Sequence, residues 1–473
     1  MIAEILDYIV GILWGPTLLI GLVGTGLYFT IITGFWQLRN LKRAFLFCLS
    51  PKKKSDGKQS ETTVSPYQAA AVAIGSSIGS GNIGGVAGAI ALGGPGALFW
   101  MWITALVGMM TKMVEVTLAV YYRKKEPDGK NTGGPLFYIE KGIGKKFKYW
   151  KPIAVLFGLG LCMQLVLSPE NFSVGESLQE LTGVRALYAS IVFGILCFIV
   201  VCGGLKRVIN FATLMMPIMS LLYIIFGAYV ILLNVSELPA AFALIVKSAF
   251  QPTAAVGGFA GASFMLAARS GISRGLFSNE AGWGTSPMVH ATADNKHPIE
   301  QGMWGIMEVF IDTIVVCSIT GLVIIVTGEW SSGAAGVTLT MRAFSRGLGK
   351  FAAIFVAVSV FLFCWTTVTG WFSYFHSVFE FAFADNPRLK KASIVFLKFS
   401  APGFGLLMTF LIDVFNVDTA YAWLIVDISS AIPTYVNLIV LICLTKVFLR
   451  ILKDYEGPKK LYGLAEYDKV KMD

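Results

Sequence analysis

Charged residues are scarce in this 473-residue chain, because Lys, Arg, Asp and Glu together make up 14%, whereas a soluble protein has roughly 25%. No polar segment is much longer than 30 residues, which argues against a separate soluble or signalling domain. The three histidines and seven cysteines show no metal-ligand spacing. No nucleophile–base or metal cluster favours an enzyme, and we expect no cofactor.

Long apolar runs make up most of the sequence. The chain is 55% hydrophobic, with 35 Phe, 11 Trp and a mean hydropathy of +0.70, and runs of about 20 residues, enough to cross a bilayer, recur throughout. We predict an all-α polytopic membrane protein with about eleven spans. They are expected near 9–36, 67–93, 97–121, 152–170, 186–203, 208–233, 260–291, 300–327, 351–383, 393–412 and 419–448.

The net charge of +10 is concentrated beside these runs rather than spread along the chain. Basic residues gather in 37–66, in 122–151 and in the tail from 446, as expected of cytoplasmic loops. We therefore attribute the positive charge to membrane topology rather than to nucleic-acid binding. The predicted orientation has the N-terminus outside and the C-terminus in the cytoplasm. Segment 328–350 is an exception, since it should be external yet holds three basic residues. The first run lacks a basic n-region and is interpreted as a retained helix rather than a signal peptide.

Two spans are interrupted by glycine-rich stretches, at 79–85 and at 278–287. With the first helix set aside, each interruption falls in the first helix of a set of five. Interrupted spans at matching positions are typical of inverted-repeat transporters and indicate the binding site. The predicted division is 1–66 for the extra helix and basic loop, 67–234 and 235–448 for the two repeats, and 449–473 for the tail.

The interruptions offer free backbone groups at membrane depth, where they must be buried or line a polar cavity. Helix N-termini favour an anion and free carbonyls favour a cation, which suits a zwitterionic amino acid and a small monovalent cation. Uncharged polar side chains accompany both breaks: Ser76, Ser77, Ser80, Asn82, Ser278, Asn279, Thr285 and Ser286. Close packing through small residues is the alternative. The Gly79-x-Gly81-x-x-Gly84 spacing also matches a dinucleotide fingerprint, but the first acid beyond it is Glu115, and no strand precedes it.

Ionisable residues within the spans are either paired or functional. Lys112 and Glu115 lie one turn apart, so we expect them to neutralise each other. Glu280 lies in the second break and is a candidate cap for the following half-helix. Glu308 and Asp312 cannot pair together, which makes Arg269 or Arg274 candidate partners, and Asp427 is isolated in the last span. The hydroxyls of Thr366 and Thr367 suit a hard cation, although such threonines more often bond their own i−4 carbonyl.

Two stretches carry a family resemblance. GGPGALFWMWITALVG (93–108) and RGLFSNEAG (274–282), followed by Gly284 and Pro287, resemble the alanine/glycine:cation symporters, also called sodium:alanine symporters. The resemblance covers nearly the whole chain and implies the leucine-transporter-like fold. Trp283-Gly-Thr departs from the family, which more usually has a smaller apolar residue followed by Gly-Ser. If Trp283 points inward, it shrinks the pocket towards glycine or alanine.

The resemblance also implies a site. The GxGN motif falls on 79–82, so the substrate carboxylate would meet backbone N–H groups around Ser77, Ser80 and Gly81, with Asn82 beside them. The amino group would meet carbonyls and side chains around Phe277, Ser278 and Asn279, while Gln164 and Trp371 would form pocket walls. Sodium would bind the carbonyls of Gly75 and Ile78 and the hydroxyls of Thr366 and Thr367, which reverses the expectation for that threonine pair.

The resulting hypothesis is sodium-coupled symport of alanine or glycine by alternating access in a prokaryotic plasma membrane. The expected partners are the small amino acid, sodium and the lipid bilayer. A proton-coupled carrier that uses Glu280, Asp312 or Asp427 is the first alternative. A membrane amino-acid sensor that binds its ligand without flux is the second.

Overall fold

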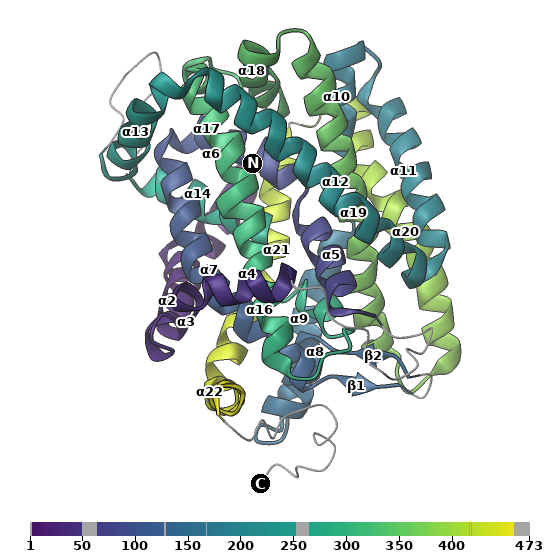
Figure 1. The fold of residues 1–473 in the computed structure, drawn as a ribbon. Helices are drawn as coiled ribbons and strands as arrows, with labels where there is room; N and C mark the ends of the chain where they lie inside the picture. The colour runs from purple at the N-terminus through teal and green to yellow at the C-terminus, as the bar shows by residue number, and fades with distance from the viewer. Residues whose placement is uncertain are drawn as a thin grey trace.

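The computed structural model describes residues 2–49, 64–126, 129–166, 168–251, 264–415, 417 and 419–457. Parts of three predictions lie outside these residues: the basic loop over 50–63, the start of the seventh span at 260–263 and the tail from 458. The described chain is a bundle of long helices with one short β-hairpin (Figure 1). The prediction of an all-α polytopic protein is confirmed.

The first half of the chain builds the following elements: α1 (Ile2–Leu13), α2 (Pro16–Ile32), α3 (Trp36–Arg39), α4 (Leu41–Leu49), α5 (Pro66–Ser77), η1 (Gly81–Gly85), α6 (Val86–Gly93), α7 (Gly96–Tyr121), β1 (Lys124–Lys125), β2 (Asn131–Thr132), α8 (Pro135–Tyr138), η2 (Ile139–Ile143), α9 (Trp150–Val166), α10 (Glu170–Thr182), α11 (Ala186–Cys202) and α12 (Gly204–Leu233). Strands β1 and β2 pair antiparallel.

The second half builds these elements: η3 (Val235–Glu237), α13 (Leu238–Phe250), α14 (Phe264–Asn279), α15 (Pro287–His290), α16 (Pro298–Val309), η4 (Phe310–Cys317), α17 (Ser318–Val326), η5 (Glu329–Ser331), α18 (Gly336–Leu348), α19 (Phe351–Ala382), α20 (Pro387–Phe415), α21 (Thr419–Cys443) and α22 (Thr445–Glu456). The helix of 328–350, which the charge pattern did not explain, is therefore α18.

Eight stretches of the described chain are long and apolar enough to cross a membrane: Tyr8–Ile32, Gly96–Tyr121, Trp150–Thr182, Gly204–Leu233, Pro298–Val326, Phe351–Ala382, Pro387–Phe415 and Val426–Cys443. Shorter apolar helices occupy Gly81–Gly93 and Ala186–Cys202. The predicted span at 152–170 corresponds to α9, and a separate helix, α10, follows it from Glu170 to Thr182. The last span ends at Cys443 rather than at 448, and α22 begins at Thr445 as a separate helix at the base of the bundle (Figure 1).

Both breaks are present, with bounds that differ from those predicted. Helix α5 ends at Ser77, Ile78 is extended, and η1 then forms a wide turn, so irregular backbone covers only the start of 79–85. The second break runs from 280 to 286 between α14 and α15. Gly282 and Gly284 have φ of 92° and 84°, left-handed values that glycine adopts at no steric cost.

The two ends of the bundle carry different segments. The β1–β2 hairpin and α22 lie at one end, and α13 and α18 lie at the other (Figure 1). The sides of the bundle expose apolar residues, such as Leu214, Leu221 and Ile225 of α12. Helix α5 packs on α12 and α19, while α14 packs on α6 and α7, so both breaks lie inside the bundle.

Candidate functional site

Two side chains already occupy the backbone N–H groups of the first break. The N–H of Gly79 donates to Asn82 Oδ1 at 2.9 Å. The N–H and hydroxyl of Ser80 donate to the Glu170 carboxylate at 3.0 and 2.9 Å. Glu170 is 1% exposed, and the site residues expected from the sequence did not include it. The signal that could have revealed it is an acid at a helix start directly after Pro169.

The four residues implied for sodium lie close together. The hydroxyls of the two threonines among them, however, point in different directions. Thr367 donates to the carbonyl of Ile78 at 3.2 Å, which joins α19 to the first break. The Thr366 hydroxyl lies 2.9 Å from its own helix's Phe363 carbonyl. A Cβ added to Gly75 would lie 3.5 Å from the Thr366 Cβ. Ile78 and Thr367 therefore meet through oxygen atoms, whereas Gly75 and Thr366 meet through carbon.

A buried carboxylate, Asp312, gathers the polar side chains of both broken helices. It accepts from Asn82 Nδ2 at 2.6 Å and from Ser278 Oγ at 2.8 Å. Asn279 donates instead to the Thr313 hydroxyl at 3.0 Å. The expected pairing of Asp312 with Arg269 or Arg274 is wrong, because its described partners are uncharged donors.

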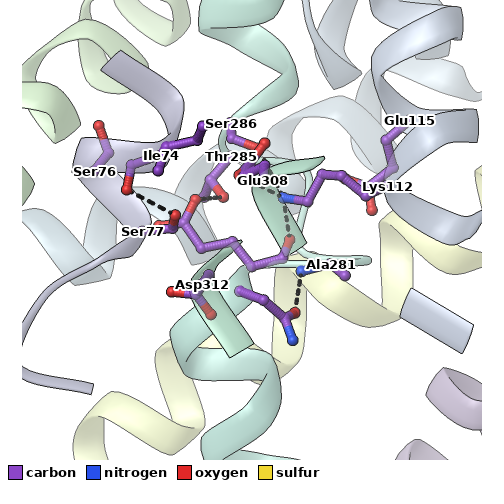
Figure 2. Close-up of polar contacts among 12 residues, drawn as sticks. Ile74, Ser76, Ser77, Lys112, Glu115, Ala281, Thr285, Ser286, Glu308 and Asp312 are labelled. Atoms are coloured by element: carbon purple, nitrogen blue, oxygen red, sulfur yellow. Dashed lines mark hydrogen bonds and ion pairs between the residues drawn. The ribbon is translucent and has the colours of Figure 1, made fainter. Parts of the chain in front are cut away.

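Helix α7 holds the second break through Lys112 and Glu115, which do not pair with each other as expected. Lys112 Nζ donates to the Glu280 carbonyl at 3.0 Å and to Ser286 Oγ at 2.7 Å, and it forms an ion pair with Glu308 Oε1 at 3.3 Å. Glu115 accepts the N–H groups of Gly282 and Gly284. Figure 2 shows the Lys112 ammonium group pointing at this break. The two side chains thus replace hydrogen bonds that the interrupted helix lacks.

Glu308 also differs from the sequence-based prediction, which offered Arg269 or Arg274 as its partner. Besides Lys112, it contacts His290 Nε2 at 2.9 Å. The amide of Gln301 donates to His290 Nδ1, so Nε2 carries the ring hydrogen and donates to Glu308. All of these side chains are fully buried.

The Glu280 side chain reaches across to α19 and does not cap α15, which corrects the cap prediction. Its carboxylate accepts from Trp371 Nε1 at 3.1 Å, Thr285 Oγ1 at 2.5 Å and Tyr374 OH at 3.2 Å. Glu280 has φ of 55°, a conformation that costs a non-glycine residue about 1–3 kcal/mol and that clusters at functional sites.

Trp283 is fully buried beside Phe277, which was implied for the amino group, and Trp371, which was implied as a pocket wall. Its ring centroid lies 6.1 Å from that of Phe277 and 6.1 Å from that of Trp371. Its Nε1–H has no hydrogen-bond partner among the described residues. Trp283 therefore points into the helix bundle, among the aromatic residues of the candidate site.

Asp427 lies in α21, and Gln164 of α9 contacts the same helix. Gln164 Nε2 donates to Ser429 Oγ at 2.5 Å and to the Val426 carbonyl at 3.2 Å. Asp427 is not isolated as predicted, since Arg274 forms an ion pair with it at 3.1 Å.

A cavity of about 880 Å³ opens beside the site. Its lining includes Ser373, two residues beyond Trp371, and Met288 of α15, together with Lys130, Asn131 and Lys206. Lys130 and Asn131 belong to the basic segment 122–151 that is predicted to be cytoplasmic. The cavity is therefore lined both by α15, which follows the second break, and by that predicted cytoplasmic segment.

Comparison with known proteins identifies the family of this chain. The sequence model of the sodium:alanine symporter family matches residues 1–468. The chain belongs to this family. An uncharacterized transporter of Haemophilus influenzae is 37% identical over 461 residues, covering 96% of each chain.

Two further members of the sodium:alanine symporter family have more specific names. The putative sodium/proton-dependent alanine carrier protein YrbD of Bacillus subtilis is 36% identical, covering 95% of this chain and 91% of its own. The sodium/alanine symporter AgcS of Methanococcus maripaludis is 35% identical, covering 82% and 85% respectively.

Among solved structures, MhsT in complex with L-phenylalanine matches with a TM-score of 0.60 and 15% identity, covering 88% of this chain and 94% of its own. This match shows the leucine-transporter-like fold. As a member of the sodium:alanine symporter family, the chain is a multi-pass membrane transporter and not an enzyme.

Proposed function

We propose that this transporter couples the entry of sodium to uptake of alanine or glycine by alternating access. The observation that carries the proposal is the meeting of both broken helices at buried polar groups, because Asn82 of the first and Ser278 of α14 share Asp312. The printed names of AgcS and YrbD, both alanine carriers, support the substrate class. The cluster of Phe277, Trp283 and Trp371 supports a small substrate, because three large rings lie together at the candidate site.

We place the sodium ion and the substrate carboxylate where the family resemblance implies. Sodium is coordinated by the carbonyls of Gly75 and Ile78 and by the hydroxyls of Thr366 and Thr367, and the contact between Thr367 and Ile78 supports this placement. The substrate carboxylate binds N–H groups around Ser77, Ser80 and Gly81. Since Ser80 now donates to Glu170, the substrate must displace that carboxylate.

Uptake of labelled alanine and glycine into proteoliposomes tests the proposal. We expect uptake against a concentration gradient when sodium is high outside, and only equilibration when sodium is equal on both sides. Identical time courses in the two conditions would show that uptake is not coupled to sodium. Binding without any flux would instead identify a sensor.

Proton coupling is the second candidate, and one observation favours it. Glu280 and Asp312 are buried carboxylates that form no ion pair with a described basic residue, so a proton is a possible counter-charge for each. YrbD is named as sodium/proton-dependent. Alanine accumulation driven by a pH gradient in sodium-free buffer would establish this mechanism.

The orientation and the repeats complete the proposal. We place the N-terminus outside and the C-terminus in the cytoplasm of a prokaryotic plasma membrane, with repeats at 67–234 and 235–448. The location of the β1–β2 hairpin and α22 at one end of the bundle is consistent with this orientation (Figure 1). Labelling of a cysteine placed at Lys125 by an impermeant maleimide should occur only after the membrane is opened.

A further inference from the structure

The side chains expected to meet the substrate's amino group have other partners in the structure. Ser278 donates to Asp312 and Asn279 donates to Thr313, so both side chains point towards η4. The next residue along the chain, Glu280, instead faces α19. The question is therefore what this carboxylate binds.

The charge balance around Glu280 leaves it without a counter-charge. The described residues near it include one lysine, Lys112, and two other carboxylates, Glu115 and Glu308. Lys112 forms its ion pair with Glu308, and it reaches Glu280 only through the backbone carbonyl. A buried carboxylate held by neutral donors alone is costly, so a positive group is expected beside Glu280 when the site is filled.

The surroundings of Glu280 favour an organic ammonium group over a metal ion. Trp371 donates an N–H to one carboxylate oxygen, and an indole N–H offers a hard metal ion no oxygen ligand. The ring of Trp371 belongs to an aromatic cluster with Trp283 and Phe277. A carboxylate together with an aromatic cluster is a combination that recognises ammonium groups.

A second observation also indicates a ligand. Trp283 in the aromatic cluster is fully buried, and its Nε1–H has no partner among the described residues. A buried N–H donor without an acceptor is unfavourable. A substrate that carries a carboxylate beside its ammonium group supplies the missing acceptor.

We propose that Glu280 is the residue that binds the substrate's α-ammonium group, with the aromatic cluster of Phe277, Trp283 and Trp371 packed around it. This inference rests on the proposed function only in requiring an α-amino acid as substrate. It assigns the charge recognition to the side chain of the second break rather than to Ser278 and Asn279. Thr285 and Tyr374 are positioning residues, because they hold the Glu280 carboxylate.

The test compares two ligands that differ at one group. Alanine and 2-hydroxypropanoate share a methyl and a carboxylate, but a hydroxyl replaces the ammonium in the second. Their dissociation constants are measured by titration calorimetry on purified full-length protein in saturating sodium, for wild type and for Glu280→Gln. Glu329→Gln is the matched control, because Glu329 is also buried and pairs with Arg346 at 2.7 Å away from the breaks.

We expect Glu280→Gln to weaken alanine binding by about 30-fold or more, the usual effect of removing one partner of a buried charge pair. Binding of 2-hydroxypropanoate should stay within about 3-fold of wild type, so discrimination between the two ligands collapses. The control should retain the discrimination. Thr285→Val, which removes one donor to Glu280, should weaken alanine selectively by a few-fold and serves if Glu280→Gln does not fold.

Three outcomes would overturn the proposal. Unchanged discrimination in Glu280→Gln would show that the ammonium binds elsewhere. Equal weakening of both ligands would give Glu280 a structural role. A shift only in the sodium concentration needed for binding would make it a cation ligand. If the wild type binds a different amino acid, that compound and its 2-hydroxy analogue replace alanine and 2-hydroxypropanoate in the test. The proposed substrate is then wrong, while the role of Glu280 can still be tested. If the wild type binds no amino acid, both proposals are wrong.

Discussion

The backbone N–H of Ser80 donates to the carboxylate of Glu170 at 3.0 Å, across 90 residues of sequence. The Ser80 hydroxyl donates to the same group at 2.9 Å. A carboxylate of the protein thus occupies an N–H group that the substrate's carboxylate is proposed to use. A Cβ at Gly79 would lie 2.6 Å from Thr367 Oγ1 and 3.2 Å from Glu170, so only glycine allows this approach.

Glu170→Gln should therefore strengthen alanine binding. A neutral amide oxygen is a weaker acceptor than a carboxylate, whose hydrogen bonds are about twice as strong, so the substrate meets a weaker competitor. We expect the dissociation constant of alanine to fall several-fold, measured by calorimetry. Glu176→Gln, on the same helix, is the control. Weaker binding in Glu170→Gln would show that Glu170 builds the site instead of competing for it.

The threonine pair of α19 gives a comparison between neighbours. Thr367→Val should raise the sodium concentration for half-maximal alanine uptake by about 10-fold or more, because it removes an oxygen that lies at the Ile78 carbonyl. Thr366→Val should have a smaller effect, since that hydroxyl bonds its own helix. Sodium titrations of uptake in proteoliposomes measure both. Equal sodium dependence in Thr367→Val and wild type would place the ion elsewhere.

Lys112→Met should destabilise the protein strongly. It leaves Glu308 buried without its lysine, and breaking a buried pair in this way costs about 3–5 kcal/mol. Unfolding of the purified protein in detergent measures the loss. The double variant Lys112→Met/Glu308→Gln should recover part of it, and additive losses would show that the two residues do not act as a pair.

Trp283→Ala should widen the range of substrates. The ring fills space between Phe277 and Trp371, and in an apolar pocket each methylene group changes discrimination by about 10-fold or more. Uptake of leucine relative to alanine should rise by at least that factor, while Trp283→Phe should stay close to wild type. An unchanged ratio in Trp283→Ala would place the ring outside the substrate pocket.

The breaks could be predicted from the sequence, but the partners of the charged residues could not. Glycine-rich interruptions in apolar spans are local features, and both lie where the composition indicated. Lys112 and Glu115 lie one turn apart on α7, yet their partners come from distant parts of the sequence. These partners are the second break and Glu308 of α16. The same limit explains Asp427, which pairs with Arg274, and Glu170, whose partner Ser80 lies 90 residues away in the sequence.

The hold of α7 on the second break has a mechanical consequence. From the same helix, Lys112 donates to a carbonyl of the break, and Glu115 accepts hydrogen bonds from two of its N–H groups. Helix α7 and the break therefore travel as a rigid body, because sliding them apart would strand buried polar groups. We expect the movement that opens and closes the site to occur where the break meets other helices, as at the contact between Glu280 and α19.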